Sequence, residues 1–109
     1  MAGHLVMLHG MTGTSEMIRP FADRICPNGW GVCDIDAPFK HPKRGFAWWM
    51  RDDPPEAPLD YETLEQVKLS IAHVLSSVPK DGPLIVGGFS QGAAIAQELL
   101  LTEVSDRIE

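Results

Sequence analysis

Apolar residues gather in three short runs along the chain, and a stretch with helical spacing follows each of them. Strands are predicted at residues 4–8, 31–36 and 84–89. Helices are predicted at residues 15–26, 60–78 and 91–103. This alternation of strand and helix is typical of a parallel α/β sheet. We therefore expect three parallel strands, with the first strand in the centre of the sheet.

The helix at residues 60–78 and the strand at residues 84–89 carry the clearest patterns. In the helix, apolar residues recur every three or four positions and share one face, with Asp60 as a candidate N-cap. The strand is apolar without alternation, as expected where helices cover both faces. Residues 39–58 are rich in proline and charge, so we expect a long functional loop there.

The composition places the chain among folded globular proteins of one domain. Its 109 residues are 44% hydrophobic and 22% charged. The formal net charge of -6 disfavours nucleic acid and anionic membranes as partners, because both select clusters of lysine and arginine. No apolar run is long enough to span a bilayer, and the chain does not begin with a secretory signal. A cytoplasmic location is the resulting expectation.

Cys26 and Cys33 offer little for metal or redox chemistry. They form no C-x-x-C pair, and no cluster of histidines accompanies them. We expect two buried thiols in a reducing compartment. Neither a metal nor an organic cofactor is implied by the sequence.

The segment GFSQG at residues 88–92 fits the G-x-S-x-G motif of a nucleophile elbow. A serine in so sharp a turn between strand and helix leaves no room for neighbouring side chains, which explains Gly88 and Gly92. The start of the helix also offers unpaired N–H groups, and the N–H of Gln91 is the natural donor to a developing oxyanion. The alternative is an ordinary turn in which Ser90 only caps the helix.

A second motif, HGMTG at residues 9–13, directly follows the first strand. In hydrolases with a nucleophile elbow, the loop at this place supplies the second N–H group of the oxyanion hole. Its glycines let the backbone face the reacting carbonyl. The alternative is a simple turn from strand to helix. Because both motifs occur in one chain, the hydrolase interpretation is favoured over both alternatives.

Three segments resemble the α/β-hydrolase fold, and within it the phospholipase/carboxylesterase family that includes acyl-protein thioesterases and small bacterial carboxylesterases. They are VMLHGMTG, the AP of DIDAPF with the AWWMRD that follows, and GGFSQGAA. The resemblance covers essentially all of residues 1–109 as a single domain. It implies a serine hydrolase of carboxylic esters or thioesters that forms an acyl-enzyme on Ser90.

The resemblance also implies roles for other residues. The backbone N–H groups of Met11 and Gln91 would form the oxyanion hole. Trp48 and Trp49 would border the substrate pocket, although aromatic residues that anchor a long loop are an equal alternative. Thr12 stands where the family's H-G-x-G pattern has its second glycine.

The family's acid and base follow the serine in the order Ser, Asp, His, and this chain has no histidine after Ser90. His4, His9, His41 and His73 all precede it, and we expect structural or solvated roles for them. We interpret the chain as the amino-terminal portion of a hydrolase, truncated before the triad Asp and His. Alone, it is expected to be inactive or weakly active, because only the oxyanion hole and binding then contribute to catalysis.

A different interpretation is a catalytically silent fragment that serves as a binding or assembly module. A three-stranded sheet has two unpaired edges, and such an edge can pair with a second copy of the chain or with a complementing chain. A third interpretation keeps Ser90 but changes the chemistry, for example to that of a perhydrolase. The leading interpretation expects a small-molecule ester or thioester as substrate and leaves its acyl and alcohol groups open.

Overall fold

A computed structural model of the chain describes residues 2–50 and 61–109. The elements in chain order are β1 (His4–Leu8), α1 (Ser15–Ile25), β2 (Gly31–Cys33), β3 (Phe39–Lys40), β4 (Phe46–Ala47), α2 (Tyr61–Ser77), β5 (Leu84–Gly88) and α3 (Gln91–Glu98). Two short 3-10 helices follow α3, at Leu99–Leu101 and Ser105–Arg107. The strands β2, β1 and β5 form a parallel sheet in that order, and β3 and β4 form a separate antiparallel hairpin. The predicted parallel α/β architecture is confirmed, and the first strand is central.

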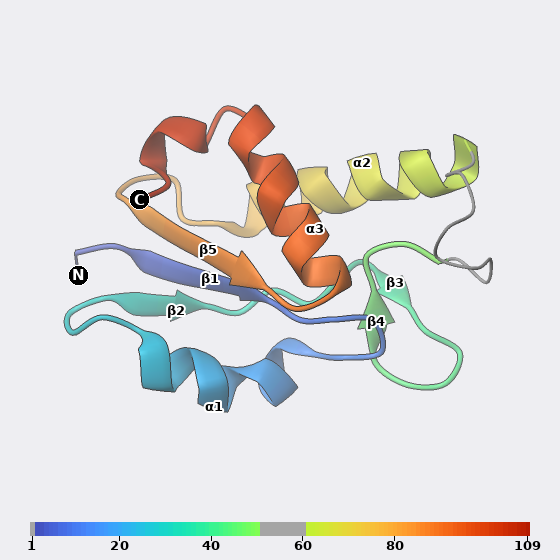
Figure 1. Ribbon diagram of the computed structural model, residues 1–109, viewed down its shortest axis with the longest axis horizontal. Coiled ribbons are helices and arrows are strands. Elements are labelled where there is room, and N and C mark those ends of the chain that lie inside the picture. The colour runs from blue at the N-terminus through green and yellow to red at the C-terminus, as the bar shows by residue number, and fades with distance from the viewer. Residues whose placement is uncertain (1, 51–60) are drawn as a thin grey trace.

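The register of β1 and β5 fixes where the next two loops begin. His4 lies opposite Leu84 at the start of the pair, and Leu8 lies opposite Gly88 at its end. The carboxyl ends of the two strands are therefore level. In Figure 1 the two arrowheads end side by side, next to the start of α3. Ligands of open α/β sheets bind at this edge, beyond the carboxyl ends of the strands.

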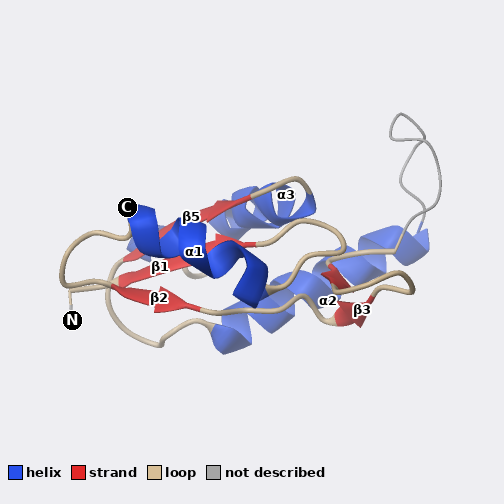
Figure 2. Ribbon diagram, turned by 90° about the horizontal axis from the view of Figure 1, so that it is seen from below, coloured by secondary structure: helices blue, strands red, loops and turns tan. Residues whose placement is uncertain are grey.

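Helices cover both faces of the sheet: α1 lies on one face, and α2 and α3 lie on the other (Figures 1 and 2). Successive side chains of β1 alternate between the two faces, as strand geometry requires. Leu5 and Met7 pack with Ala22 of α1. Val6 and Leu8 belong to the larger core on the other face. The buried members of that core from outside the sheet are Ile35, Ala37, Trp48, Val74, Val78, Ile95, Leu99 and Val104.

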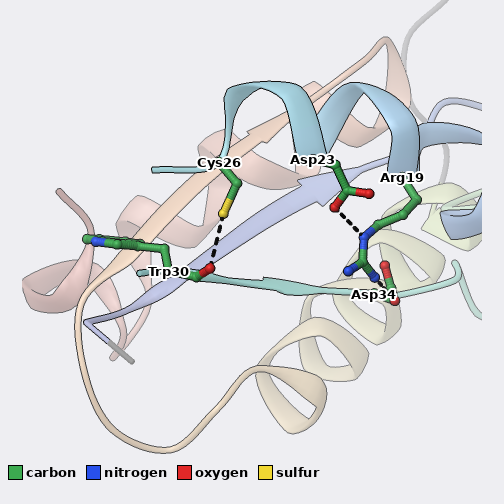
Figure 3. Close-up of polar contacts among 5 residues, drawn as sticks. All are labelled: Arg19, Asp23, Cys26, Trp30 and Asp34. Carbon is green, nitrogen blue, oxygen red and sulfur yellow. Dashed lines mark hydrogen bonds and ion pairs between the residues drawn. The ribbon is translucent and has the colours of Figure 1, made fainter. Parts of the chain in front are cut away.

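Polar contacts attach α1 to β2 on the exposed side of the molecule (Figure 3). Arg19 donates to Asp23 at 2.7 Å and to Asp34, which follows β2, at 2.6 Å. The hydrogen bond to Asp23 and the charge of Asp34 raise the pKa of the guanidinium. The thiol of Cys26 donates to the carbonyl of Trp30 across the turn between α1 and β2. Because exposed ion pairs add little stability, these contacts chiefly define how α1 lies on the sheet.

Two elements are shorter than the sequence pattern predicts. The strand predicted at residues 31–36 ends at Cys33, because β2 is an edge strand that pairs with β1 at three positions. The helix predicted at residues 91–103 ends as an α-helix at Glu98 and tightens into a 3-10 turn. There the Thr102 hydroxyl donates at 2.7 Å to the carbonyl three residues earlier, which closes the turn.

The hairpin β3–β4 was not predicted. It lies in the stretch at residues 39–58, where we expected only an irregular loop, and its strands have two residues each. Residues 51–58 of that stretch lie outside the described residues, as does Asp60, the predicted N-cap of α2. No helix within residues 2–50 and 61–109 is long and apolar enough to cross a membrane.

Candidate active site

The turn at Ser90 joins β5 to α3 with an unusual backbone conformation. Ser90 has φ 53° and ψ -118°, a region that glycine favours over other residues. Its side chain is exposed and makes no hydrogen bond to the start of α3. Non-glycine residues held in such a conformation cost about 1–3 kcal/mol and persist where the surrounding structure fixes them. The serine therefore projects its hydroxyl from a constrained turn and does not cap the helix with it.

The two glycines of the elbow are required by close backbone contacts. A Cβ at Gly92 would overlap the carbonyl oxygen of Leu8 and would lie 2.5 Å from that of His9. A Cβ at Gly88 would lie 2.5 Å from the carbonyl oxygen of Gly92. The amide of Phe89 donates to Leu8 at 3.1 Å, which continues the β1–β5 pairing into the turn. The start of α3 thus packs directly against the end of β1.

The loop after β1 turns toward the elbow. A Cβ at Gly10 would lie 3.5 Å from the Cβ of Ser90, so the two turns are in contact. The amide of Gly13 donates to the Gly10 carbonyl at 3.0 Å and closes a tight turn. Thr12 lies within this turn with φ 68°. Thr12 therefore adopts a left-handed backbone conformation at the position where the phospholipase/carboxylesterase family has a glycine.

The hairpin β3–β4 holds this loop from its other side. The amide of Thr12 donates to the Phe46 carbonyl at 2.9 Å, and the amide of Phe46 donates to the Gly13 carbonyl at 3.0 Å. Gly45, with φ 59°, lets the hairpin come this close, because a Cβ there would collide with the carbonyls of Thr12 and Gly13. The loop at residues 9–13 is thus fixed between the elbow and the hairpin.

Two backbone N–H groups at this junction have no acceptor among the described residues. The N–H groups of Thr12, Gly13 and Gly92 are all used in the bonds of the turns. Within residues 2–50 and 61–109, no hydrogen bond is donated by the N–H of Met11 or of Gln91. Free N–H groups at a helix start and in a glycine-containing loop favour negative charge.

The side chain of Gln91 ties three segments together. Its amide oxygen accepts from the Trp48 N–H at 3.0 Å, and its amide nitrogen donates to the Trp49 carbonyl at 3.0 Å. The same nitrogen lies 3.5 Å from the sulfur of Met11. Gln91 is 8% exposed, so these polar contacts are shielded from water. The residue that follows the serine therefore positions both neighbouring loops.

His9 and Trp48 form a buried pair beneath the site. The Ala37 amide donates to Nε2 of His9 at 2.9 Å, so Nδ1 carries the proton and donates to the Gly10 carbonyl at 2.7 Å. The indole N–H of Trp48 donates to the His9 carbonyl at 2.7 Å, and the two rings stack with centroids 5.2 Å apart. The hydroxyl of Ser70 in α2 donates to the Trp48 carbonyl. Every ring nitrogen of the pair is thus used inside the protein.

A shallow groove of about 290 Å³ lies beside these turns. It is bounded by the loop after β1, the first turn of α1, the hairpin and the elbow. Its lining residues are His9, Gly10, Met11, Thr12, Gly13, Thr14, Met17, Ile18, Arg44 and Phe89. Ser90 is not among them, but Phe89 precedes it and Gly10 contacts it, so the groove adjoins the elbow. The walls are mostly apolar or backbone, so the groove suits a small organic molecule.

The comparison with protein families decides what kind of chain this is. The profile of the serine hydrolase (FSH1) family matches residues 31–106, which is most of the chain and includes the elbow. The chain belongs to the serine hydrolase (FSH1) family. Among solved structures, it is similar to acyl-protein thioesterase 2 from Zea mays, with 30% identity and a TM-score of 0.59 over 86% of this chain. It spans 43% of the length of that thioesterase. No curated protein sequence matches it.

Membership of the serine hydrolase (FSH1) family confirms the α/β-hydrolase resemblance that the elbow and the loop after β1 indicated. The fold and the membership of a serine hydrolase family are therefore established for the region that includes Ser90. The roles of the individual site residues go beyond these comparisons and are taken up below as proposals.

Trp48 and Trp49 differ in their surroundings. Trp48 is fully buried and belongs to the core, so its contacts are those of a residue that anchors the long loop. Trp49 is partly buried and lines a small cavity of about 120 Å³ with Val67, Ile95 and other residues of α2 and α3. Neither ring lines the groove beside Ser90.

Three of the four histidines form ring hydrogen bonds elsewhere in the described structure, and the fourth, His4, lies far from the elbow. Both ring nitrogens of His9 are bonded, Nδ1 of His41 accepts from the Lys43 amide at 3.1 Å, and Nε2 of His73 donates to the Asp36 carbonyl at 2.8 Å. His4 begins β1, at the opposite end of that strand from the elbow. Within the described ranges, no hydrogen bond joins a histidine to the Ser90 hydroxyl.

Sequence reasoning identified the elbow but not its supports. It treated Gln91 only as a backbone donor and did not find its side-chain bonds to the Trp48–Trp49 backbone. It did not place Ser70 or the hairpin in the site. The one available signal was the position of Gln91 inside the elbow motif. A long polar side chain that is buried in so tight a turn needs hydrogen-bond partners within the protein.

Proposed function

We propose that this chain carries the nucleophile of a serine hydrolase that cleaves carboxylic esters or thioesters through an acyl-enzyme on Ser90. One observation supports this most strongly: Ser90 is exposed in a glycine-like conformation, directly before Gln91 and in contact with the loop that contains Met11. The backbone N–H groups of Met11 and Gln91 have no acceptor within the described residues. A turn strained in this way is expected at a functional site. An ordinary connection between strand and helix gains nothing from it.

The proposed reaction follows from that arrangement. The Ser90 oxygen attacks the carbonyl carbon of the substrate, and the negative charge develops on the carbonyl oxygen. The N–H groups of Met11 and Gln91 stabilise this oxyanion, because they are fixed in place before the reaction begins. Collapse of the intermediate expels the alcohol or thiol and leaves an acyl group on Ser90. Water then attacks the acyl-enzyme and releases the carboxylic acid.

A serine at its ordinary pKa needs a base, and we propose that the base and its acid partner come from polypeptide outside these 109 residues. All four histidines precede Ser90, and the hydrogen bonds of His9, His41 and His73 hold each of them away from this task. The oxyanion hole and binding can by themselves give about 10³–10⁴-fold acceleration over water. Acylation by an activated ester is therefore expected even without the base.

The ester or thioester class is supported by the groove and by the relatives. The groove is open and mostly apolar, which suits a neutral acyl group next to the serine. The Zea mays protein is a thioesterase that acts on acylated protein, as its name states. We extend to this chain only the chemistry of acyl transfer to a serine.

The test is acylation of the full chain by 4-nitrophenyl acetate, followed by intact mass and peptide mapping. We expect one acetyl group on Ser90, formed faster than on other serines, and its loss in Ser90→Ala. Ser76→Ala, which removes an exposed hydroxyl from α2, should leave the adduct unchanged. Acetylation that persists in Ser90→Ala would overturn the proposal and favour the catalytically silent module.

A further inference from the structure

The turn of the hairpin β3–β4 is basic in a chain whose net charge is -6. Lys40 ends β3, Lys43 and Arg44 lie in the turn, and all three are exposed. Within residues 2–50 and 61–109, none of these three side chains makes an ion pair or a hydrogen bond. By contrast, Arg19 on α1 is shared between two aspartates. The hairpin thus presents positive charge that the described part of the protein does not neutralise.

Arg44 brings part of this charge to the groove beside Ser90. Among the lining residues of that groove, it has the only formal charge. Two acidic residues lie near the start of α1: Asp36, which accepts from the Ser15 amide at 2.7 Å, and Glu16 in the first turn. Neither forms an ion pair with Arg44 within the described residues. The guanidinium is therefore available to an anion that enters the groove.

The backbone of the turn holds Arg44 in position. The His41 amide donates to the Gly45 carbonyl at 2.9 Å, and the Lys43 amide donates to the His41 ring. The next residue, Phe46, is bonded in both directions to the loop after β1. Arg44 thus lies two residues before Phe46, whose backbone is bonded to Thr12 and Gly13 in the loop that also contains Met11.

Apolar side chains also line the groove. Met17 and Phe89 are both well exposed, and Ile18 lies beside them in the lining. Phe89 is held edge-on against Phe21 of α1, with ring centroids 5.3 Å apart. Exposed apolar side chains gathered at a groove mark a binding surface for an apolar group. The groove therefore combines apolar side chains with one cation, Arg44, that has no ion-pair partner among residues 2–50 and 61–109.

We propose that the substrates of the Ser90 site carry an anionic group that Arg44 binds, while an apolar part of the substrate packs on Met17 and Phe89. This inference rests on the proposed function, because it names the substrate class of the same site. The planar guanidinium binds carboxylate, sulfonate or phosphate through two parallel hydrogen bonds. Lys40 and Lys43 add a positive field that speeds the approach of an anion, and salt screens that field.

The anion can belong to the acyl group or to the leaving group, and two matched pairs of substrates distinguish these cases. For the acyl side, 4-nitrophenyl glutarate is compared with 4-nitrophenyl pentanoate. For the leaving side, the butyryl thioester of 2-mercaptoethanesulfonate is compared with that of 2-mercaptoethanol. The measured quantity is the second-order rate of acylation at Ser90, read from released nitrophenol or thiol and corrected for the reaction of Ser90→Ala.

We expect the anionic member of at least one pair to lose about three- to tenfold in rate in Arg44→Gln, with its neutral partner changed less than twofold; this is the range for one exposed charge-assisted bond. Arg24→Gln, which removes an exposed arginine from the last turn of α1, should change neither member. Arg44→Lys should restore part of the preference for the anionic substrate, because lysine keeps the positive charge but lacks the two parallel N–H donors of the guanidinium. Equal ratios in wild type and Arg44→Gln for both pairs would overturn the inference and leave the proposed function standing.

A binding measurement tests the role of Arg44 even if no acylation is observed. In Ser90→Ala, hexanoate and hexanamide are titrated while the amide signals of the groove residues are followed by NMR. We expect hexanoate to bind more tightly, to shift the signals of Thr12 and Met17, and to lose this advantage in Ser90→Ala/Arg44→Gln. Equal affinity of the two ligands would overturn the inference. Absent acylation with retained hexanoate preference would instead count against the proposed function alone.

Discussion

Gln91→Leu tests whether a single side chain holds the loops of the site together. Leucine keeps the size of the side chain but can neither accept from the Trp48 N–H nor donate to the Trp49 carbonyl. Trp48 is fully buried, so its N–H loses its acceptor out of reach of water, at a cost of about 1–3 kcal/mol. The Trp49 carbonyl is part-buried, and its loss is about 0.5–1 kcal/mol.

The greater apolarity of leucine offsets about 1 kcal/mol of this loss. We therefore expect the free energy of unfolding to fall by about 2 kcal/mol in Gln91→Leu. With a urea m-value of about 1–1.5 kcal/mol/M for a chain of this size, the midpoint should fall by about 1.5 M. Equilibrium urea unfolding followed by circular dichroism and by tryptophan fluorescence measures this shift.

The control is Gln97→Leu, the same chemical change on the exposed side of the same helix. Gln97 is exposed and makes no hydrogen bond within the described residues, so its replacement should change stability by less than about 0.5 kcal/mol. Equal midpoints for Gln91→Leu and Gln97→Leu would refute the reasoning, because the amide contacts would then contribute nothing to stability.

Three further predictions concern the elbow and one thiol. Ser90→Gly should be more stable than Ser90→Ala by about 1 kcal/mol or more in urea unfolding, since only glycine adopts φ 53° without strain; the reverse order would show an unstrained turn. Gly92→Ala should lose about 1–3 kcal/mol in the same assay, because its Cβ would overlap the Leu8 carbonyl, and wild-type stability would contradict the packing described here. Burial, and secondarily the charge of Asp34, raise the pKa of Cys33, so in Cys26→Ser its alkylation rate should rise with pH at a higher midpoint than that of free cysteine; a midpoint at or below the free value would contradict this.

The strands and the site turns were predictable because strong local constraints set them. β5 is apolar over its whole length and ends in the elbow motif, and both features follow from burial and from the steric demands of Ser90. The central place of β1 was also predicted and is confirmed. The three apolar runs, with a helix after each, were enough to predict a three-stranded parallel sheet.

The exact ends of elements depend on partners that are distant in the chain. β2 stops at Cys33 because the pairing with β1 stops there, although the buried residue Ile35 lies only two positions further on. The hairpin β3–β4 has two residues per strand, too few for an alternating pattern. Its stability comes from the bonds of Phe46 to the loop after β1, which no local pattern reveals.

The supports of the site were unpredictable for the same reason. The hydrogen bonds of Gln91 reach backbone groups more than forty positions away. They contribute to stability because they are buried at the junction of three segments. Thr12 is a case in which the sequence signal was visible but its structural consequence was not. A threonine at a glycine position indicates a changed loop from the sequence alone, yet the hydrogen bonds of Phe46 and Gly10 hold the turn in the conformation that glycine would adopt.

The account rests on the claim that the folded elbow, and not serine chemistry in general, makes Ser90 reactive. The most direct measurement is labelling of the full chain with a fluorophosphonate, with the modified residue identified by peptide mass spectrometry in buffer and in denaturing urea. The account predicts an adduct on Ser90 in buffer, faster than on any other serine, and its loss in urea. Labelling that is spread over several serines, or that Ser90 retains unchanged in urea, would contradict it.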